Sequence, residues 1–361
     1  MTASGISSMT LNVALLVDAT SQLAGQDSPE YFLFGSEAVE AIDAALSRLG
    51  HRPRRLSFDM GVSRMVALLS SDPVDVVFLL GQPEATDPAG EAKVAALLDL
   101  LQIAHTSEST EALMLATDKA RAKAICAHYG LPTPPYAVAI NGELPFTLPP
   151  GPWIAKPTLE DGSRGITCEA PASDRAQLAE RVRSLYTRFA EPVLIETFVG
   201  GREFRVGIIG SDLLPIAEVD FSRLPEHCPH VAGYESKWKY DSVEFKNLHY
   251  LCPAPVDAAL GDRLRNLSHR TAAAFGLQRC SRLDIRMDDK GELHILDVNA
   301  NPDLSPVAIM HEMARVAGFG YDGLVQRLLD LARTGRRMGT SDRSERTTEH
   351  TVGLSQSMTH G

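Results

Sequence analysis

The first hundred residues alternate between short apolar runs and longer segments in which apolar residues recur every three or four positions. Segments 36–50 and 62–70 predict helices, and three apolar runs predict strands: LNVALLVDA (11–19), PRRLSFD (53–59) and VDVVFLLG (74–81). Strands and helices in regular succession are typical of a parallel sheet covered by helices. We therefore predict an α/β domain over residues 10–106, with residues 1–9 disordered.

The pattern changes after Gly81. A predicted helix at 91–104 and the segment 107–135 lead to a proline-rich connector, LPFTLPPGP (144–152). A helix is predicted at 174–189, and four strands are predicted: WIAKP (153–157), PVLIETFV (192–199), EFRVGIIG (203–210) and LLPIAEVDF (213–221). Residues 222–252 show no period and predict irregular structure.

The last third predicts a helix at 256–276, a hairpin, and a helical region that runs from Ser305 to about Arg337. We place a central domain at 107–196 and a C-terminal domain at 197–337. The remaining residues, 338–361, are too polar to build a core, so we expect a disordered tail.

The hairpin carries the densest group of candidate site residues. RLDIRM (282–287) and ELHILDVN (292–299) flank the turn-forming DDKG. Alternation places Arg282, Asp284 and Arg286 on one face of the first strand. The second strand divides less cleanly, but Asp297 and Asn299 are two residues apart and point the same way. Antiparallel pairing would gather Asp284, Asp297 and Asn299, with Arg282 beside them.

Two carboxylates and an amide oxygen are a suitable ligand set for magnesium, which prefers hard oxygen ligands. An exposed hairpin with ordinary surface charges is the competing interpretation, and DVNANPDLSP could also form a plain turn.

Composition narrows the class of protein. The 361 residues are 44% hydrophobic and 22% charged, which is typical of a globular protein of two or three domains. Asp and Glu outnumber Lys and Arg by 46 to 35, giving a formal net charge of -11. This balance argues against nucleic acid or an anionic membrane as the main partner.

Cysteine usage and the N-terminal run bear on location. The five cysteines are scattered and never spaced as CxxC, which favours reduced thiols over disulfides or zinc. The run at 11–19 is too short for a membrane span and lacks a basic leader. We expect a cytoplasmic protein.

Two lysines upstream of the hairpin are candidate phosphate ligands. Lys156 closes the strand WIAKP and precedes the loop EDGSRG, an arrangement in which a lysine and backbone amides can hold phosphate. Lys237, in YESKWKY, could close over phosphate from another loop. Each could equally be an ordinary surface lysine.

The segment VLIETFVGGREF suggests a nucleotide hinge. Glu196 precedes a short stretch, including Phe198 and Val199, whose backbone could read an adenine edge, and Glu203 after the glycine pair could bind ribose hydroxyls. The alternative is a strand that ends in a Gly-Gly turn.

In this order, these motifs resemble the ATP-grasp superfamily, most closely the D-alanine:D-alanine ligase family. The resemblance covers about residues 77–306, and its motifs are TDKARAK, GLPTPP, Lys156-Pro157, the loop with Gly162, Ser163 and Gly165, ETFVGGREF, YESKW, RLDIR and DVNANP. It implies an α/β, three-domain architecture in which two α+β domains clamp ATP behind an N-terminal parallel-sheet domain. It also implies a homodimer acting on amino-acid or carboxylate and amine substrates.

The resemblance implies roles for individual residues. For ATP, it implies phosphate binding by Lys119, Lys156 and Lys237, adenine binding by Glu196, Phe198 and Val199, and ribose binding by Glu203. For the metal, it implies that Asp284, Asp297 and Asn299 bind two Mg²⁺ ions, which Mn²⁺ can replace. The implied catalytic residues are Arg282, Lys237 and Ser163. In the implied reaction a carboxylate attacks the γ-phosphate of ATP, and an amine then attacks the acyl phosphate.

The sequence departs from the family where amino-acid substrates would bind. The family's N-terminal glycine-rich loop is replaced by DATSQLAGQDSPEYFLFGS, in which Glu30 could supply the missing carboxylate, and its HG and GEDG loop by LGQPEATDPAG. Gly162 and Trp238 replace a serine and a tyrosine of a hydrogen-bonded triad. Asp303 replaces a glycine, Ala308 falls where a serine grips substrate, and Asp297 replaces a glutamate. Trp238, Asp303 and Ser305 are further candidate substrate residues.

We therefore predict an ATP-dependent ligase, of the kind found in specialised-metabolite assembly, whose substrates are not two D-alanines. The alternatives are a genuine D-alanine:D-alanine ligase with a rebuilt pocket, a kinase that phosphorylates a small acid, and a nucleotide-binding protein without turnover.

Overall fold

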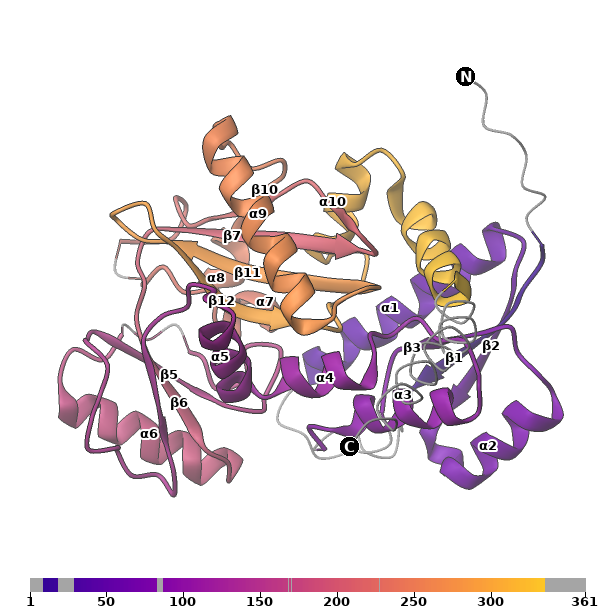
Figure 1. The fold of residues 1–361 in the computed structure, drawn as a ribbon, viewed down its shortest axis with the longest axis horizontal. Helices are drawn as coiled ribbons and strands as arrows, with labels where there is room; N and C mark the ends of the chain where they lie inside the picture. Colours follow the sequence, from indigo (N-terminus) through magenta and orange to yellow (C-terminus); the bar gives the residue numbers. More distant parts are fainter. Residues whose placement is uncertain are drawn as a thin grey trace, which may run out of the picture.

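The computed structural model describes residues 9–18, 29–82, 87–167, 169, 171–226 and 228–334, without the side chains of residues 29–36. Within these residues the strands form three sheets, each carrying helices (Figure 1). The disorder predicted for 1–9 and 338–361 falls, except for Met9, outside this description.

The N-terminal sheet is parallel, with strand order β2-β1-β3. Its strands are β1 (Asn12–Val17), β2 (Arg52–Ser57) and β3 (Val76–Leu79), and its helices are α1 (Pro29–Arg48), α2 (Val62–Ser71) and α3 (Gly90–Leu100), with a short 3₁₀ turn at Phe58–Met60. Both faces of β1 are buried in apolar clusters, Val13 and Leu15 on one side and Ala14 and Leu16 on the other. A parallel sheet needs this double cover, so the predicted α/β arrangement is confirmed.

The central sheet is antiparallel, with strand order β4-β6-β5. It consists of β4 (Tyr136–Ala139), β5 (Trp153–Pro157) and β6 (Val193–Thr197), and α6 (Arg175–Phe189) lies on one face (Figure 1). Leu178 and Val182 of α6 pack against Val193 and Ile195 of β6. Asp174 caps the helix by accepting hydrogen bonds from the amides of Ala176 and Gln177.

The largest sheet is antiparallel, with strand order β10-β9-β7-β11-β12 and a short strand β8 beside β7. Its strands are β7 (Arg202–Ile209), β8 (Asp212–Leu213), β9 (Ala217–Asp220), β10 (His249–Leu251), β11 (Cys280–Met287) and β12 (Leu293–Asn299). Helices α4 (Thr110–Thr117), α5 (Lys119–His128) and α9 (Ala258–Phe275) share a buried apolar cluster with one face of this sheet. The other face of β7 and β11 carries charged residues and lines a cavity.

The predicted hairpin is confirmed, and a bulge explains its uneven pattern. Asp284 pairs with Asp297, but the next pair is Ile285 with Ile295, so Leu296 has no partner on β11. A bulge shifts the alternation by one residue. Ile295 is therefore buried in the core while Asp297, two positions later, lines the cavity.

The structure corrects three local predictions. The single strand predicted at 213–221 is two strands, β8 and β9, because Pro215 between them has no amide to donate to a sheet. Residues 222–252 contain α7 (Glu235–Trp238), α8 (Val243–Asn247) and β10, which are too short to show a period in the sequence. Strand β4 was not predicted.

The C-terminal helices return to the first sheet. Met310 and Met313 of α10 (Ile309–Val316), with Leu324 of the helix at residues 320–334, pack in one cluster with Val13 and Phe78. In Figure 1 the helix at 320–334 accordingly lies beside the N-terminal sheet. This packing joins the two chain halves and encloses the charged face of the largest sheet.

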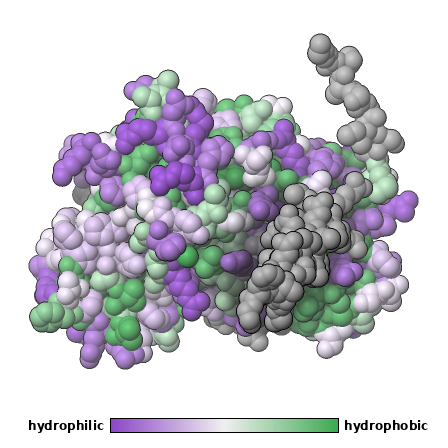
Figure 2. All heavy atoms as spheres, in the orientation of Figure 1, coloured by the Kyte–Doolittle hydropathy of each residue, from purple (hydrophilic) through white to green (hydrophobic). Residues whose placement is uncertain are grey.

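The surface of the described residues is largely hydrophilic where helices meet solvent. Hydrophilic side chains gather over α9 in Figure 2, on the side away from its buried apolar residues. Among the described helices, none combines the length and apolar character needed to cross a membrane. Cys126, Cys228, Cys252 and Cys280 are free thiols, as predicted; Cys168 lies outside the described residues.

Candidate active site

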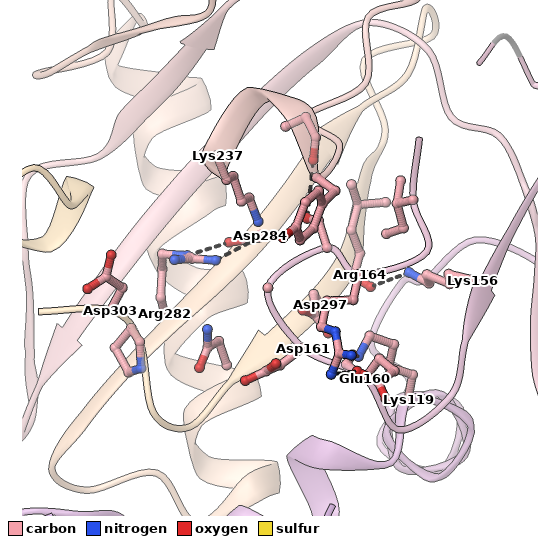
Figure 3. A pocket seen from close by; sticks show the side chains of 18 of the residues that line it. Lys119, Lys156, Glu160, Asp161, Arg164, Lys237, Arg282, Asp284, Asp297 and Asp303 are labelled. Carbon is pink, nitrogen blue, oxygen red and sulfur yellow. Dashed lines mark hydrogen bonds and ion pairs between the residues drawn. The ribbon is translucent and has the colours of Figure 1, made fainter. Parts of the chain in front are cut away.

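A cavity of about 770 Å³ lies where the three sheets meet. It is lined by fourteen of the predicted site residues: Lys119, Lys156, Ser163, Glu196, Phe198, Val199, Glu203, Lys237, Trp238, Arg282, Asp284, Asp297, Asn299 and Asp303. Figure 3 shows the charged side chains converging from separate elements. Residues from Lys119 to Asp303, a span of 185 positions in the sequence, are thus brought to one place.

The sheet register builds the centre of this site. Asp284 on β11 pairs with Arg205 on β7 and with Asp297 on β12, so these three residues form one row across the sheet. Arg282 pairs with Asn299 in the adjacent row. Side chains opposite one another on a sheet face have Cβ atoms about 5 Å apart. The strand pairing therefore fixes the predicted metal ligands side by side.

Asp284 is held by two guanidinium groups. Arg282 donates from Nε to Oδ1 over 2.8 Å and from Nη2 to Oδ2 over 3.1 Å, and Nε of Arg205 lies 3.4 Å from Oδ1. Burial opposes the charge of Asp284, but the two arginines outweigh it and hold the pKa of Asp284 well below its usual range. Figure 3 shows the Arg282–Asp284 pair beside Lys237.

Glu196 is clamped between two buried lysines. Its Oε1 lies 2.6 Å from Nζ of Lys123 and its Oε2 lies 2.6 Å from Nζ of Lys156. Both lysines also approach the carbonyl of Leu296, the bulge residue, at 3.2 Å and 3.4 Å. Burial favours the neutral acid, but the two ammonium groups outweigh it and lower the pKa of Glu196. This cluster ties β5 and β6 to β12.

Two loops meet over the cavity. The indole Nε1 of Trp238 donates to the carbonyl of Gly162 over 2.7 Å, and Oγ of Ser163 donates to the carbonyl of Ala232 over 3.3 Å. Gly162 and Ser163 both have positive φ, 54° and 63°, which a tight turn requires. Arg164 forms an ion pair with Glu160 at 2.7 Å within the same loop. The two positions that depart from the expected triad are thus joined by a different hydrogen bond.

Known proteins resemble this chain over most of its length. Residues 146–330 match the family described as "D-ala D-ala ligase C-terminus". A "D-alanine--D-alanine ligase" of Alcanivorax borkumensis is 31% identical over 67% of this chain and 74% of that protein, and one of Gluconobacter oxydans is 28% identical over 87% and 96%. This chain belongs to the ATP-grasp D-alanine–D-alanine ligase family.

Solved structures of family members agree with the fold. The D-alanine–D-alanine ligase from Bacillus anthracis, in a crystal structure "complexed with ATP", has a TM-score of 0.70 to this chain at 17% identity. The similarity covers 91% of this chain and 100% of that one. The predicted ATP-grasp architecture is confirmed, and the protein is a ligase of the class that forms C–N bonds.

In this ligase the predicted hinge is already engaged within the protein. The amide of Phe198 donates to the carbonyl of Pro152 over 2.7 Å, and the carbonyl of Val199 accepts from Nη1 of Arg286 over 2.6 Å. Both oxygens of Glu203 receive guanidinium groups, from Arg205 at 2.5 Å and from Arg286 at 2.7 Å. Binding of adenine and ribose by these residues stays a prediction, and it would have to use their remaining backbone groups and lone pairs.

Lys119 and Asp303 line the cavity of the ligase, whereas Ser305 is buried beside it. Lys119 Nζ donates to the carbonyl of Glu160 at the cavity wall. Asp303 faces the cavity near Arg282 (Figure 3), and burial raises its pKa. Ser305 is fully buried, is not among the described residues that line the cavity, and donates from N and Oγ to Asp303 at 2.7 Å and 2.9 Å. The side chain of Glu30 lies outside the described residues.

Sequence reasoning missed an acidic wall of the ligase cavity. Asp18 directly follows β1, Glu91 belongs to α3 and Asp161 to the Gly162 loop, and all three line the cavity. Burial and repulsion by Asp161 raise the pKa of Glu91 to about 7, against a 2.6 Å hydrogen bond from Asn301. Asp18 and Asp161 lie in segments discussed above, DATSQLAGQDSPEYFLFGS and the EDGSRG loop, but nothing in either segment marks them as site residues, because only tertiary packing brings them together with Glu91. Arg205 and Lys123 were also missed, although Arg205 shares the strand face of the predicted Glu203.

We expect Glu196→Gln to destabilise the ligase by about 3–5 kcal/mol, because it leaves two buried ammonium groups beside each other. Urea unfolding followed by circular dichroism measures this free energy. Glu180→Gln is the matched control, since Glu180 pairs with Arg183 on the exposed side of α6. The control should change stability by less than about 0.5 kcal/mol. Equal effects in both variants would contradict a structural role for the buried cluster.

Proposed function

We propose that this protein joins the carboxylate of one amino-acid-like substrate to the amine of another, at the cost of ATP, and that its substrates are not two D-alanines. One observation supports this most strongly: the predicted phosphate-binding and metal-binding residues meet in one cavity, while the positions that depart from the family also line it. The relatives' names support the ligase class.

Cationic side chains equip the cavity for a triphosphate. Lys119, Lys156 and Lys237 approach from an α-helix, a central strand and a short loop helix, and Arg282 lies on the sheet on the same side of the cavity as Lys237 (Figure 3). Fixed charges in a site that excludes water stabilise the charge that develops on a transferred phosphoryl group. Arg282 is the group that we assign to this task.

The reaction proceeds in two displacements. A carboxylate oxygen attacks the γ-phosphorus of ATP, and the bond from that phosphorus to the bridging oxygen breaks, releasing ADP. The amine nitrogen of the second substrate then attacks the carbonyl carbon of the acyl phosphate. The C–O bond breaks, phosphate leaves, and the nitrogen loses a proton to solvent. The residues of the cavity orient the substrates and keep water from the acyl phosphate.

Magnesium fits the oxygen-rich end of the hairpin. Asp297 and Asn299 present a carboxylate and an amide oxygen from one strand, and Asp284 lies opposite Asp297. Hard oxygen donors of this kind suit Mg²⁺ or Mn²⁺. No group of three His, Cys, Asp or Glu residues suited to a metal occurs among the described residues, so Asn299 and the nucleotide phosphates would complete the set. A bound ion would act as a Lewis acid and neutralise phosphate charge.

The substrate end of the cavity supports divergence from D-alanine. Asp303 adds a carboxylate beside Arg282 at the position of the family's glycine, and Ala308 lacks the hydroxyl expected to grip a substrate carboxylate. The Trp238–Gly162 hydrogen bond closes the loops without the serine and tyrosine hydroxyls. Asp18, Glu91 and Asp161 add carboxyl groups to the cavity wall, which would favour an amine-bearing substrate.

Synthesis of D-alanyl-D-alanine is the second candidate, because the relatives with that name match this chain over up to 96% of their length. A nucleotide-binding protein without turnover and a small-acid kinase are the remaining ones. The homodimer that the resemblance implies stays a prediction, which sedimentation velocity tests.

Purified protein, MgATP and a panel of D- and L-amino acids, singly and in pairs, separate these functions. ADP release that requires two substrates, with an amide product identified by mass spectrometry, is expected for the proposed ligase. Release with D-alanine alone, yielding its dipeptide, would establish the second candidate. Acyl phosphate trapped by hydroxylamine without any amine-dependent product would indicate a kinase. Tight MgATP binding without release of ADP would indicate a silent binding protein.

We expect ATP affinity to fall as pH rises above about 8, by up to about tenfold per pH unit. Burial and the guanidinium of Arg282 lower the pKa of Lys237 to about 8, although Asp284 opposes the shift. The charged form of Lys237, which attracts phosphate, is therefore present below this pH and lost above it. Calorimetric titration with a non-hydrolysable ATP analogue measures the effect. Lys237→Arg should bind with a flat profile over the same range, and a steep profile in that variant would assign the titration to another group.

A further inference from the structure

Arg205 is a buried cation that the proposed reaction has not yet used. It lies in the middle of β7 and is 2% exposed, and its guanidinium lines the cavity. Its Nη2 contacts Glu203 at 2.5 Å and its Nε lies 3.4 Å from Asp284. Its Nη1 is buried and has no hydrogen-bond partner among the described residues. Buried guanidinium N–H groups are rarely left unpaired, so this one indicates a missing ligand.

The two carboxylates in the sheet row of Arg205, Asp284 and Asp297, have different partners. Three nitrogen atoms from Arg282 and Arg205 lie within 3.4 Å of the oxygens of Asp284. Asp297, in the same row of the sheet, has no ion pair within 4.0 Å to any described residue. Asp284 is thus paired with two guanidinium groups at close range, whereas Asp297 interacts with Lys156 and Lys237 only at longer range.

The positive side chains around Asp284 explain why the charge of Arg205 affects the site. Lys237 and Arg282 already repel each other across Asp284, and the charge of Arg205 is a further cause of the lowered pKa of Lys237. A phosphate bound among these three cations would relieve their mutual repulsion. A divalent ion placed at Asp284 would meet these cations, whereas one at Asp297 and Asn299 would meet oxygen atoms.

We propose that the guanidinium of Arg205 supplies the charge that a second divalent cation would otherwise supply, so that this site binds ATP with one divalent ion, at Asp297 and Asn299. The inference rests on the proposed ATP-dependent function. It replaces the two ions that the family resemblance implies for this chain. The free Nη1–H of Arg205 then donates to a phosphate oxygen.

Manganese binding tests the count directly. The full-length protein is held in excess over a non-hydrolysable ATP analogue, and bound Mn²⁺ is measured from the loss of the free-ion signal in electron paramagnetic resonance. One Mn²⁺ per bound nucleotide is expected for the unmodified protein. Two would overturn the inference and leave the proposed function standing. Failure of the nucleotide to bind would overturn the proposed function, and the inference with it.

Variants test the role of Arg205. Arg205→Gln should bind a second Mn²⁺ per nucleotide, because Asp284 loses one of its two arginine partners. Arg205→Lys keeps the positive charge and should bind one Mn²⁺ per nucleotide. Arg202→Gln is the matched control: Arg202 lies on the same strand but pairs with Glu218 at 2.6 Å, and it is not among the described residues that line the cavity. Arg202→Gln should also bind one Mn²⁺ per nucleotide.

A second variant guards against misfolding. Arg205→Gln combined with Glu203→Gln removes both charges of the contact between these two residues, and Arg286, the other partner of Glu203, keeps its hydrogen bonds to the carbonyls of Val199 and His230. This double variant should also gain a second Mn²⁺ site, since Asp284 again loses Arg205. A single Mn²⁺ in both neutral variants, with nucleotide bound, would show that Arg205 is only structural.

Discussion

Arg282→Ala is expected to lower kcat by about a thousandfold or more while the protein keeps its fold. A positioned arginine that stabilises the transferred phosphoryl group contributes effects of this size. The fold should survive because Asp284 retains Arg205 as a partner after the change. Initial rates of ADP release in the presence of both substrates measure the loss, and thermal melting measures the fold.

Arg263→Ala is the control for this prediction. Arg263 is an exposed arginine of α9 that donates to the carbonyl of Gly291 in the hairpin turn, so it tests whether any lost arginine near the hairpin matters. It should leave kcat within about twofold of the unmodified protein, as expected for surface positions. Near-normal rates in Arg282→Ala would reject the assignment of Arg282 to phosphoryl transfer.

Asp297→Asn should lower turnover by about a hundredfold or more and raise the Mg²⁺ concentration needed for half-maximal rate. The change keeps the shape of the side chain but removes the one carboxylate of the row that has no close ion pair among the described residues, and a metal that neutralises phosphate charge contributes several kcal/mol. Rates measured against Mg²⁺ concentration separate weaker metal binding from slower chemistry.

The hairpin offers a matched control for this change too. Asp289→Asn removes an exposed carboxylate from the turn of the same hairpin and should leave both quantities unchanged. If Asp297→Asn had an unaltered Mg²⁺ dependence, Asp297 would not be the metal ligand. The metal site would then have to be sought at Asp284, against the single-ion inference.

Much of the fold could be predicted because its signals are local. The parallel sheet follows from apolar runs that are buried on both faces, as Val13 and Ala14 show by facing opposite clusters. The hairpin follows from the turn at Asp288–Gly291, where the Asp288 side chain accepts from the amides of Lys290 and Glu292. Short elements such as β4 and α7 escaped prediction, because four residues do not establish a period.

Some residues of the candidate site could likewise be predicted from the sequence, and others could not. Lys156, Asp284 and Asp297 could be found because each lies in a motif with a fixed spacing, and the cavity brings them together. Arg205 and Glu91 have no motif, and Ser305, predicted to contact substrate, is buried and donates hydrogen bonds to Asp303. The spacing of residues in the sequence predicts which side chains share a face of a strand, but it does not predict which face borders the cavity.

By itself, the sequence determined the class of fold, the hairpin and the set of residues suited to nucleotide and metal, since these depend on periodicity and on side-chain chemistry. Only the tertiary structure decided which charges compensate one another. The bulge at Leu296 turns Asp297 toward the cavity, the register sets Arg205 beside Asp284, and the lysines Lys123 and Lys156 meet at Glu196. Electrostatic interactions depend on distance and burial, and both are fixed by packing between segments remote in the chain.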